Sequence, residues 1–107
     1  MPKYLIDRTV PNAGFLTPAE LRDTSRTSCD VLRAMGPDVQ WVHSYVTDDR
    51  ITCVYIAASE DLVREHARRA GLPADRVMEI RAVIDPTTAE GRAGATAART
   101  AAGYLRT

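Results

Sequence analysis

The fold is constrained most by two helical segments that have clear start and stop signals and lie among short segments rich in β-formers. Thr17 precedes a proline and stands three residues before Glu20, so the two side chains can cap a first helix reciprocally. Apolar and small residues continue at helical spacing up to the Gly-Pro pair at residues 36–37. A second helix starts at Ser59 and ends at the Gly-Leu-Pro sequence of residues 71–73.

The other segments predict four β-strands, at residues 4–10, 40–47, 51–57 and 76–84. The element order is therefore β-α-β-β-α-β. With two right-handed crossovers this order builds an α+β, ferredoxin-like fold, in which a four-stranded antiparallel sheet carries both helices on one face. The other face would be bare, so we expect a second copy of the chain to cover it in a homodimer.

The 107 residues suffice for one domain with its own hydrophobic core, which we place at residues 1–88. Residues 89–107 are rich in Ala, Thr, Gly and Arg, with Tyr104 and Leu105 as their bulky side chains. They are predicted to form an Ala-rich C-terminal tail. The end of this tail is a candidate for docking on a neighbouring chain or another partner.

The charge balance and the length of the apolar runs exclude several classes of protein. The 14 basic side chains are matched by 14 acidic ones, which argues against binding of nucleic acid. No apolar stretch approaches the roughly 20 residues of a membrane span, and the first residues do not resemble a signal peptide. We therefore expect a cytoplasmic protein without membrane contact, whose Cys29 and Cys53 stay reduced.

The hairpin at residues 40–57 can adopt two registers. They differ in which face of the sheet each side chain occupies. A three-residue loop at residues 48–50 would pair Tyr45 with Cys53 and His43 with Tyr55. The apolar residues of both strands would then share the face that packs on the helices. A two-residue loop mixes polar and apolar residues on both faces, so the three-residue loop is the preferred prediction.

In the preferred register, the open face of the sheet gathers titratable and aromatic side chains. Met78 and Ile80 of the last strand would point toward the helices instead. The predicted open-face set is Asp7, Trp41, His43, Tyr45, Cys53, Tyr55, Glu79 and Arg81. Such a mixture is typical of a lined pocket, but aromatic residues and an ion pair at a dimer interface explain it equally well. As binding residues we single out Trp41, His43, Tyr45, Tyr55 and Arg81.

A metal site is the first chemical interpretation of this face. His43 and Cys53 on adjacent strands, with Asp7 or Glu79 nearby, offer donors that suit nickel, copper or zinc. His66 is a further candidate ligand, although its position beside Glu65 is more typical of a solvated helix face. No pair of ligands at chelating spacing supports it on that helix.

Acid–base or nucleophilic catalysis without a cofactor is the alternative interpretation. Cys53 beside His43 could form a thiolate–imidazolium pair, and His43 with Tyr45 or Tyr55 could act as base and acid. Asp7 or Glu79 would assist such a site, which could equally bind a small molecule without turning it over. An inert buried thiol is the competing interpretation of Cys53, and a purely structural or regulatory partner-binding module remains a third possibility.

Several motifs of the hairpin and the last third of the chain are specific enough to compare with known families. They are Trp41-Val42-His43-Ser44-Tyr45-Val46, Asp48-Asp49, Cys53-Val54-Tyr55-Ile56-Ala57, Glu65, Gly71-Leu72-Pro73-Ala74-Asp75-Arg76, Glu79 and Asp85-Pro86. In these residues the chain resembles a family of small bacterial proteins of unknown function that is often labelled nickel-binding-protein-like. The resemblance covers residues 2 to about 88.

This resemblance implies a ferredoxin-like homodimer, in agreement with the strand order. It also implies a small protein that binds and sequesters nickel, Ni²⁺, or another divalent transition metal. Residues 89–107 depart from the family pattern, which usually ends near Asp85-Pro86.

Overall fold

The computed structural model describes residues 1–91, so most of the predicted tail, residues 92–107, lies outside the described residues. The elements follow the predicted order β-α-β-β-α-β, with short 3-10 helices η1 and η2 added. Their bounds are β1 Lys3–Thr9, η1 Ala13–Phe15, α1 Pro18–Met35, β2 Val39–Val46, β3 Arg50–Ala57, α2 Glu60–Ala70, β4 Arg76–Ile80 and η2 Pro86–Glu90.

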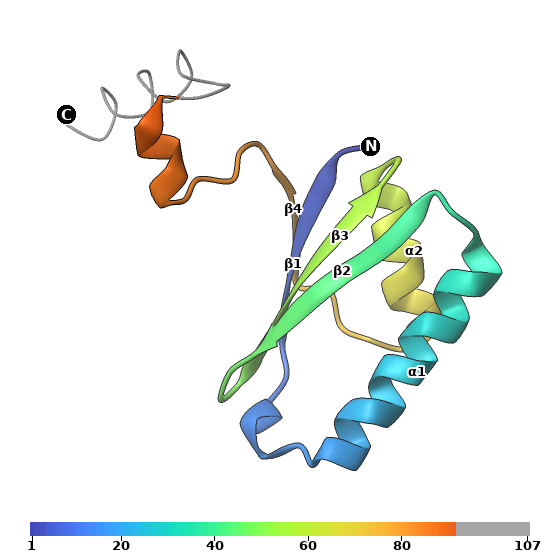
Figure 1. Cartoon of the computed structure of the whole chain (residues 1–107). Helices are drawn as coiled ribbons and strands as arrows, with labels where there is room; N and C mark the ends of the chain where they lie inside the picture. The colour runs from blue at the N-terminus through green and yellow to red at the C-terminus, as the bar shows by residue number, and fades with distance from the viewer. Residues whose placement is uncertain (92–107) are drawn as a thin grey trace.

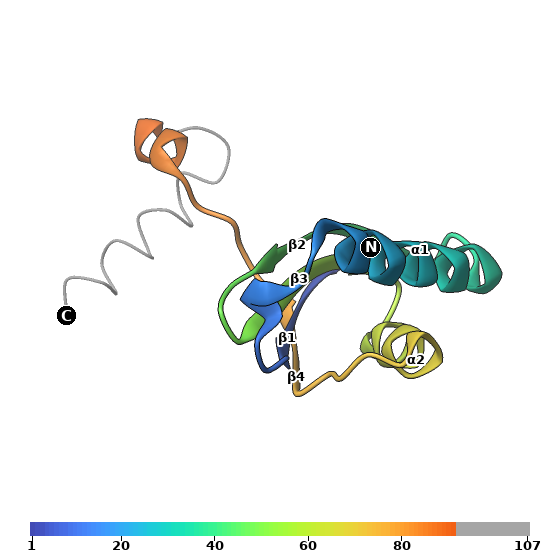
Figure 2. The same ribbon diagram turned by 90° about the horizontal axis from the view of Figure 1, so that it is seen from below.

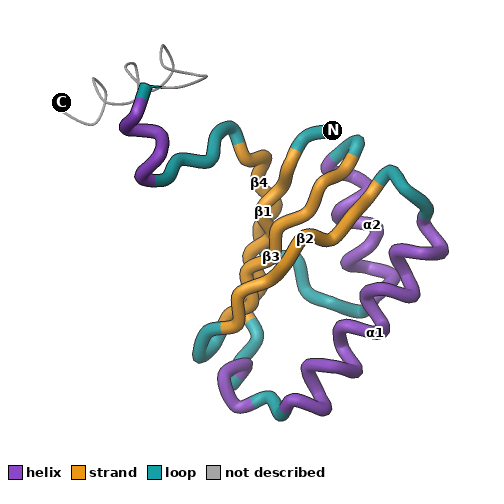
Figure 3. Tube along the Cα trace, viewed as in Figure 1, coloured by secondary structure: helices purple, strands orange, loops and turns teal. Residues whose placement is uncertain are grey.

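The four strands form one antiparallel sheet in the order β2-β3-β1-β4. Helices α1 and α2 lie together on one side of this sheet, as Figure 1 and the view from below in Figure 2 show. The predicted α+β arrangement, a four-stranded antiparallel sheet with both helices on one face, is therefore confirmed. Figure 3 shows the loop at residues 71–75 that returns the chain from α2 to β4.

Both helices begin and end at the predicted residues. At the start of α1, the Thr17 hydroxyl accepts from the Glu20 amide at 3.2 Å, and the Glu20 carboxylate accepts from the Thr17 amide at 3.0 Å. The Ser59 hydroxyl accepts from the Leu62 amide at the start of α2. Gly71 ends α2 with φ 70°, in the left-handed region that glycine adopts without strain.

The hairpin between β2 and β3 has a shorter loop than predicted, and the predicted register is wrong. The Thr47 amide donates to the Arg50 carbonyl at 2.9 Å, so the loop itself is only Asp48-Asp49. Val46 consequently pairs with Ile51, and Ser44 pairs with Cys53.

Contacts with the segment after β1 hold this tight turn. The Val10 amide donates to the Asp49 carbonyl and the Gly14 amide donates to the Asp48 carbonyl, each at 3.0 Å. A Cβ atom at Gly14 would lie 3.1 Å from the Asp48 Cα, so glycine permits the close approach. These long-range contacts supply the physical reason for a register that local patterning does not reveal.

A β-bulge between Trp41 and His43 then changes the side-chain parity of β2. On the side of the bulge away from the turn, Trp41 pairs with Tyr55. Between the bulge and the turn, His43 pairs with Val54. Trp41 therefore faces the helices while His43 faces the open side. The bulge thus brings Trp41 and Val39 to the inner face, while the open face still mixes polar and apolar side chains.

The core lies between the sheet and the two helices. Its buried residues are Tyr4, Ile6, Val39, Cys53, Tyr55, Ala57 and Val63. Because neighbouring residues of a strand alternate in direction, the open face receives the other set. This open face is defined by Lys3, Leu5, Asp7, Thr9, Gln40, His43, Tyr45, Arg50, Thr52, Val54, Ile56, Arg76, Met78 and Ile80.

The last strand is shorter than predicted, and its side chains face the sides of the sheet opposite to those predicted. It ends at Ile80, so Arg81 lies beyond it. Val77 packs against the core, whereas Met78 pairs with Leu5 and lies on the open face. The prediction that Met78 and Ile80 point toward the helices is therefore wrong.

After β4 the chain leaves the sheet on the side opposite the helices and reaches η2 (Figures 1 and 2). The Asp85 side chain accepts from the Thr87 amide at 2.8 Å and so starts this short helix. Among the described residues, no helix is long and apolar enough to cross a membrane.

Replacing Thr17 by Ala should lower the free energy of unfolding by about 1 kcal/mol, because the first turn of α1 loses its capping acceptor. Urea unfolding followed by circular dichroism measures this change. Thr27→Ala, at an exposed position of the same helix, is the matched control and should cause no loss. Equal effects of the two substitutions would contradict a role for the cap.

Candidate functional site

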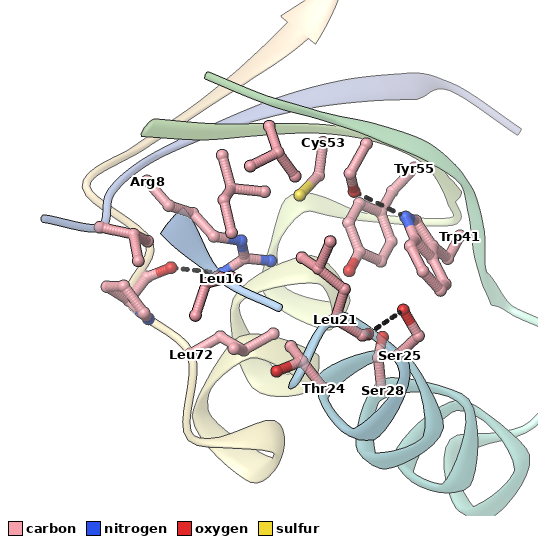
Figure 4. Close-up of a pocket in the computed structure, with 15 residues that line it drawn as sticks. Arg8, Leu16, Leu21, Thr24, Ser25, Ser28, Trp41, Cys53, Tyr55 and Leu72 are labelled. Atoms are coloured by element: carbon pink, nitrogen blue, oxygen red, sulfur yellow. Dashed lines mark hydrogen bonds between the residues drawn. The ribbon is translucent and has the colours of Figure 1, made fainter. Parts of the chain in front are cut away.

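A cavity of about 250 Å³ lies between the inner face of the sheet and α1 (Figure 4). The sheet contributes residues from β1, β2 and β3, and the loop after α2 closes one end with Leu72 and Pro73. Most of the lining is apolar, with Leu16, Leu21 and Ile51 as typical members. Thr24 and Val46 line the cavity and are also exposed, so it opens to solvent beside them.

Among the described residues, Arg8 is the one charged side chain that lines this cavity. It is 1% exposed, and its Nη1 donates to the carbonyl of Pro73. Within residues 1–91, its Nε and Nη2 have no partner with hydrogen-bond geometry, although the Tyr55 hydroxyl lies close enough for Arg8 to lower the pKa of Tyr55. A buried guanidinium without an anionic partner is unusual, because burial removes the hydration that stabilises its charge.

The other polar groups of this interior form a line from the sheet to both helices. Tyr55 is 1% exposed and its ring lies 5.2 Å, centroid to centroid, from the His66 ring. The His66 Nε2 atom lies 3.1 Å from the Ser28 hydroxyl and 3.3 Å from the Ser28 carbonyl. Ser28 of α1 and His66 of α2 thus join the two helices at the point where Tyr55 meets them.

Burial dominates the acid–base properties of these groups. It raises the pKa of Tyr55, and the nearby Arg8 charge opposes this effect only in part. Burial lowers the pKa of His66, although the Ser28 carbonyl favours its protonated form, and the Arg8 charge lowers that pKa further. Both side chains are therefore neutral near pH 7.

The predicted open-face residues are divided between the two faces of the sheet. Asp7, His43 and Tyr45 lie on the open face. The Asp7 carboxylate accepts from Arg50 at 2.8 Å. The His43 and Tyr45 rings meet edge to face with centroids 5.0 Å apart, and both are exposed.

Trp41, Cys53 and Tyr55 instead line the interior cavity, which corrects their predicted placement. Cys53 is 4% exposed, in keeping with the inert buried thiol that was the competing interpretation. The Trp41 Nε1 donates to the Ser44 hydroxyl at 2.9 Å. The two-residue turn and the bulge account for the reversal, and Cys53 and Tyr55 are not brought beside His43 on an open face.

Glu79 and Arg81 lie apart from both groups. Glu79 is on the edge strand β4, and Arg81 directly follows that strand. Glu79 pairs with Tyr4 in the register of β4 and faces the helix side at the sheet edge. Arg81 donates to Glu79 at 3.1 Å, and both residues are exposed. The ion pair is the kind expected at a solvated surface, where it contributes little to stability.

The three predicted metal ligands do not converge. His43 is on the open face, Cys53 is buried on the inner face, and His66 is 0% exposed on α2. His66 is thus a core residue that bonds to Ser28, not part of a solvated helix face. Within residues 1–91, no group of three or more His, Cys, Asp or Glu side chains could hold a metal ion. His43 alone of the three is accessible to a metal in solution.

Arg8 is a candidate site residue that the sequence analysis missed. Its signal is the alternation of Tyr4, Ile6 and Arg8, which places the arginine on the inward parity of β1. A charged residue at an inward position of a strand is itself a marker of a site. Ser28 carries no comparable signal, because its role depends on the approach of α2.

Comparisons with known proteins agree with the fold. The profile of a family described as nickel responsive protein SCO4226-like matches residues 4–80, which confirms the resemblance in the hairpin motifs. The crystal structure of SCO4226 from Streptomyces coelicolor A3(2) superposes with a TM-score of 0.66 at 17% sequence identity, over 77% of this chain and 99% of that chain. A search of curated proteins found no match.

The buried neutral His66 predicts a loss of stability in mild acid. Its pKa in the folded state is lowered, so below about pH 6.5 the unfolded chain binds a proton that the folded chain resists. The free energy of unfolding should therefore fall as pH drops from 7.5 to 5.5, by at most about 1.4 kcal/mol per pH unit for this one group. Urea unfolding across this range measures the slope.

His66→Gln should flatten that slope, since the variant has no imidazole to protonate. Thr27→Ala, at an exposed position of α1, is the control and should leave the slope as in the wild type. An unchanged slope in His66→Gln would assign the pH dependence to other groups.

Proposed function

The chain belongs to the SCO4226-like family of nickel responsive proteins, and we propose that it binds nickel, or a similar divalent transition metal, as its cargo for sequestration. The observation that carries the proposal is the exposed His43 imidazole on the open face of the sheet. Imidazole nitrogen is a good ligand for nickel. Among the described residues, neither ring nitrogen of His43 takes part in a hydrogen bond, so both are available.

One imidazole by itself makes a weak site, because nickel takes several nitrogen or oxygen ligands. The described part of a single chain offers no group of three ligands. We propose that a second copy of the chain supplies the second His43, with water in the remaining positions. The cargo site would then lie between two sheets.

The open face supports the accompanying proposal of a homodimer. Leu5, Val54, Ile56, Met78 and Ile80 lie there, and neither helix covers them (Figure 2). Tyr45 on the same face is 60% exposed. A face of this composition is stabilised when a like surface removes it from water.

The segment after β4 favours a second copy as the occupant of this face. It extends from the sheet on the open side, and its Val83 and Ile84 are 71% and 64% exposed (Figure 1). A partner sheet placed against the open face would stand beside these two side chains. Residues 92–107 are a poorer cover, since their bulky apolar side chains are Tyr104 and Leu105 alone.

Light scattering at micromolar concentration should give the wild-type chain twice the mass of one copy. Val54→Lys should reduce this to the mass of one copy while circular dichroism stays native, because it places a charge at the centre of the apolar face. Thr27→Lys, exposed on α1, is the matched control and should remain dimeric. A monomeric wild type would contradict the homodimer.

Titration with Ni²⁺ in a calorimeter should give about one ion per two chains, and His43→Asn should abolish the heat. Binding should weaken as pH falls through about 6.5, where imidazole in general begins to hold its proton against a metal. Arg26→Gln, an exposed change on α1, is the control and should bind as the wild type does. Undiminished nickel binding by His43→Asn would refute the proposal that His43 binds the metal.

A further inference from the structure

The interior cavity has the features of a second, independent binding site. It lies on the helix side of the sheet, whereas the nickel proposal concerns the opposite face (Figure 4). Its volume of about 250 Å³ is slightly below the range of about 300 to 1,000 Å³ that is usual for pockets of drug-sized ligands. A cavity of about 150 Å³ is enough for benzene in another protein, so this one suits a ring with a few further atoms.

The charge of the cavity selects the kind of ligand. Arg8 is buried, and the two nitrogens without a partner in residues 1–91, Nε and Nη2, form one edge of the planar guanidinium. That edge matches the two oxygens of a carboxylate, which it can bind with two parallel hydrogen bonds. The third nitrogen donates to Pro73 and fixes the orientation of the group.

No carboxylate among the described residues forms an ion pair with Arg8. Asp7, its neighbour in sequence, pairs with Arg50 on the other face of the sheet. Hydrogen bonds with Thr9 and, to a smaller extent, the Arg8 charge lower the pKa of Asp75. The Asp75 carboxylate accepts from the Thr9 amide at 2.5 Å and lies outside the cavity lining. An anion must therefore come from outside the described chain if Arg8 is to be neutralised.

We propose that the cavity binds a small organic monocarboxylate with an apolar body the size of about one ring. The carboxylate pairs with the free edge of Arg8, and the body lies against Leu16, Leu21 and Ile51. A monoanion fits better than a phosphate group, because Arg8 is the one cation that residues 1–91 place in the lining. The ligand enters beside Thr24 and Val46, which are exposed at the mouth.

The test uses phenylacetate, benzoate and 4-methylpentanoate as probes, with phenylacetamide as the uncharged match to phenylacetate. Nuclear magnetic resonance of the full ¹⁵N-labelled chain follows the Arg8 Nε–H signal and the amides of the cavity lining. At least one acid should shift these signals saturably, and it should bind roughly tenfold or more tightly than its uncharged match. If none of the acids binds, or the acid and the amide bind equally, the proposal is overturned.

Two variants locate the site. Arg8→Gln should weaken the acid to the level of the amide, because it removes the charge. Leu21→Trp should weaken both ligands by filling the cavity while it keeps Arg8, so it decides the matter if Arg8→Gln fails to fold. Arg22→Gln, exposed on the same turn of α1, is the control and should bind as the wild type does. Undiminished acid binding by Leu21→Trp would place the ligand elsewhere and refute the assignment.

Discussion

The two-residue turn between β2 and β3 determines which side chains of the hairpin are inside the molecule. Cys53 and Tyr55 pair with the buried Ile6 and Tyr4 of β1, so a shift of the β2–β3 pairing by one residue would instead bring His43 and Tyr45 onto the inner face. The turn is held by amides of Val10 and Gly14, which donate to the carbonyls of Asp49 and Asp48. The segment after β1 thus controls the register of a hairpin more than thirty residues away, and with it the composition of both faces.

The buried polar line of the interior depends on that register. Tyr55 on the inner face of β3 meets Ser28 of α1 and His66 of α2, and Arg8 lies beside it across the sheet. Buried polar groups restrict the packing to arrangements that satisfy them, so they help to set how both helices sit on the sheet. The His66 Nδ1 atom has no partner in residues 1–91, which is consistent with a neutral ring in this environment.

Features with local chemical signals were predictable from the sequence, and features that depend on distant contacts were not. The cap at Thr17 and the glycine at residue 71 act within one helical turn, so the helix bounds follow from them. The strand order follows from the order of the elements and the right-handed crossovers. The bulge beside Trp41 and the shorter β4 depend on how whole strands fit together. Of the candidate residues, Asp7, His43 and Tyr45 were placed correctly on the open face, while the interior cavity with Arg8 was missed.

The lack of an ion pair at Arg8 follows from the geometry of a strand. Asp7 is its neighbour in sequence, yet successive residues of a strand point to opposite faces, so Asp7 meets Arg50 on the open side. Thr9, the other neighbour, uses its amide to bind Asp75 at the strand end. Both nearby carboxylates are therefore engaged away from the cavity. The backbone arrangement that stabilises the end of β1 is thus the same arrangement that leaves the Arg8 charge available to a ligand.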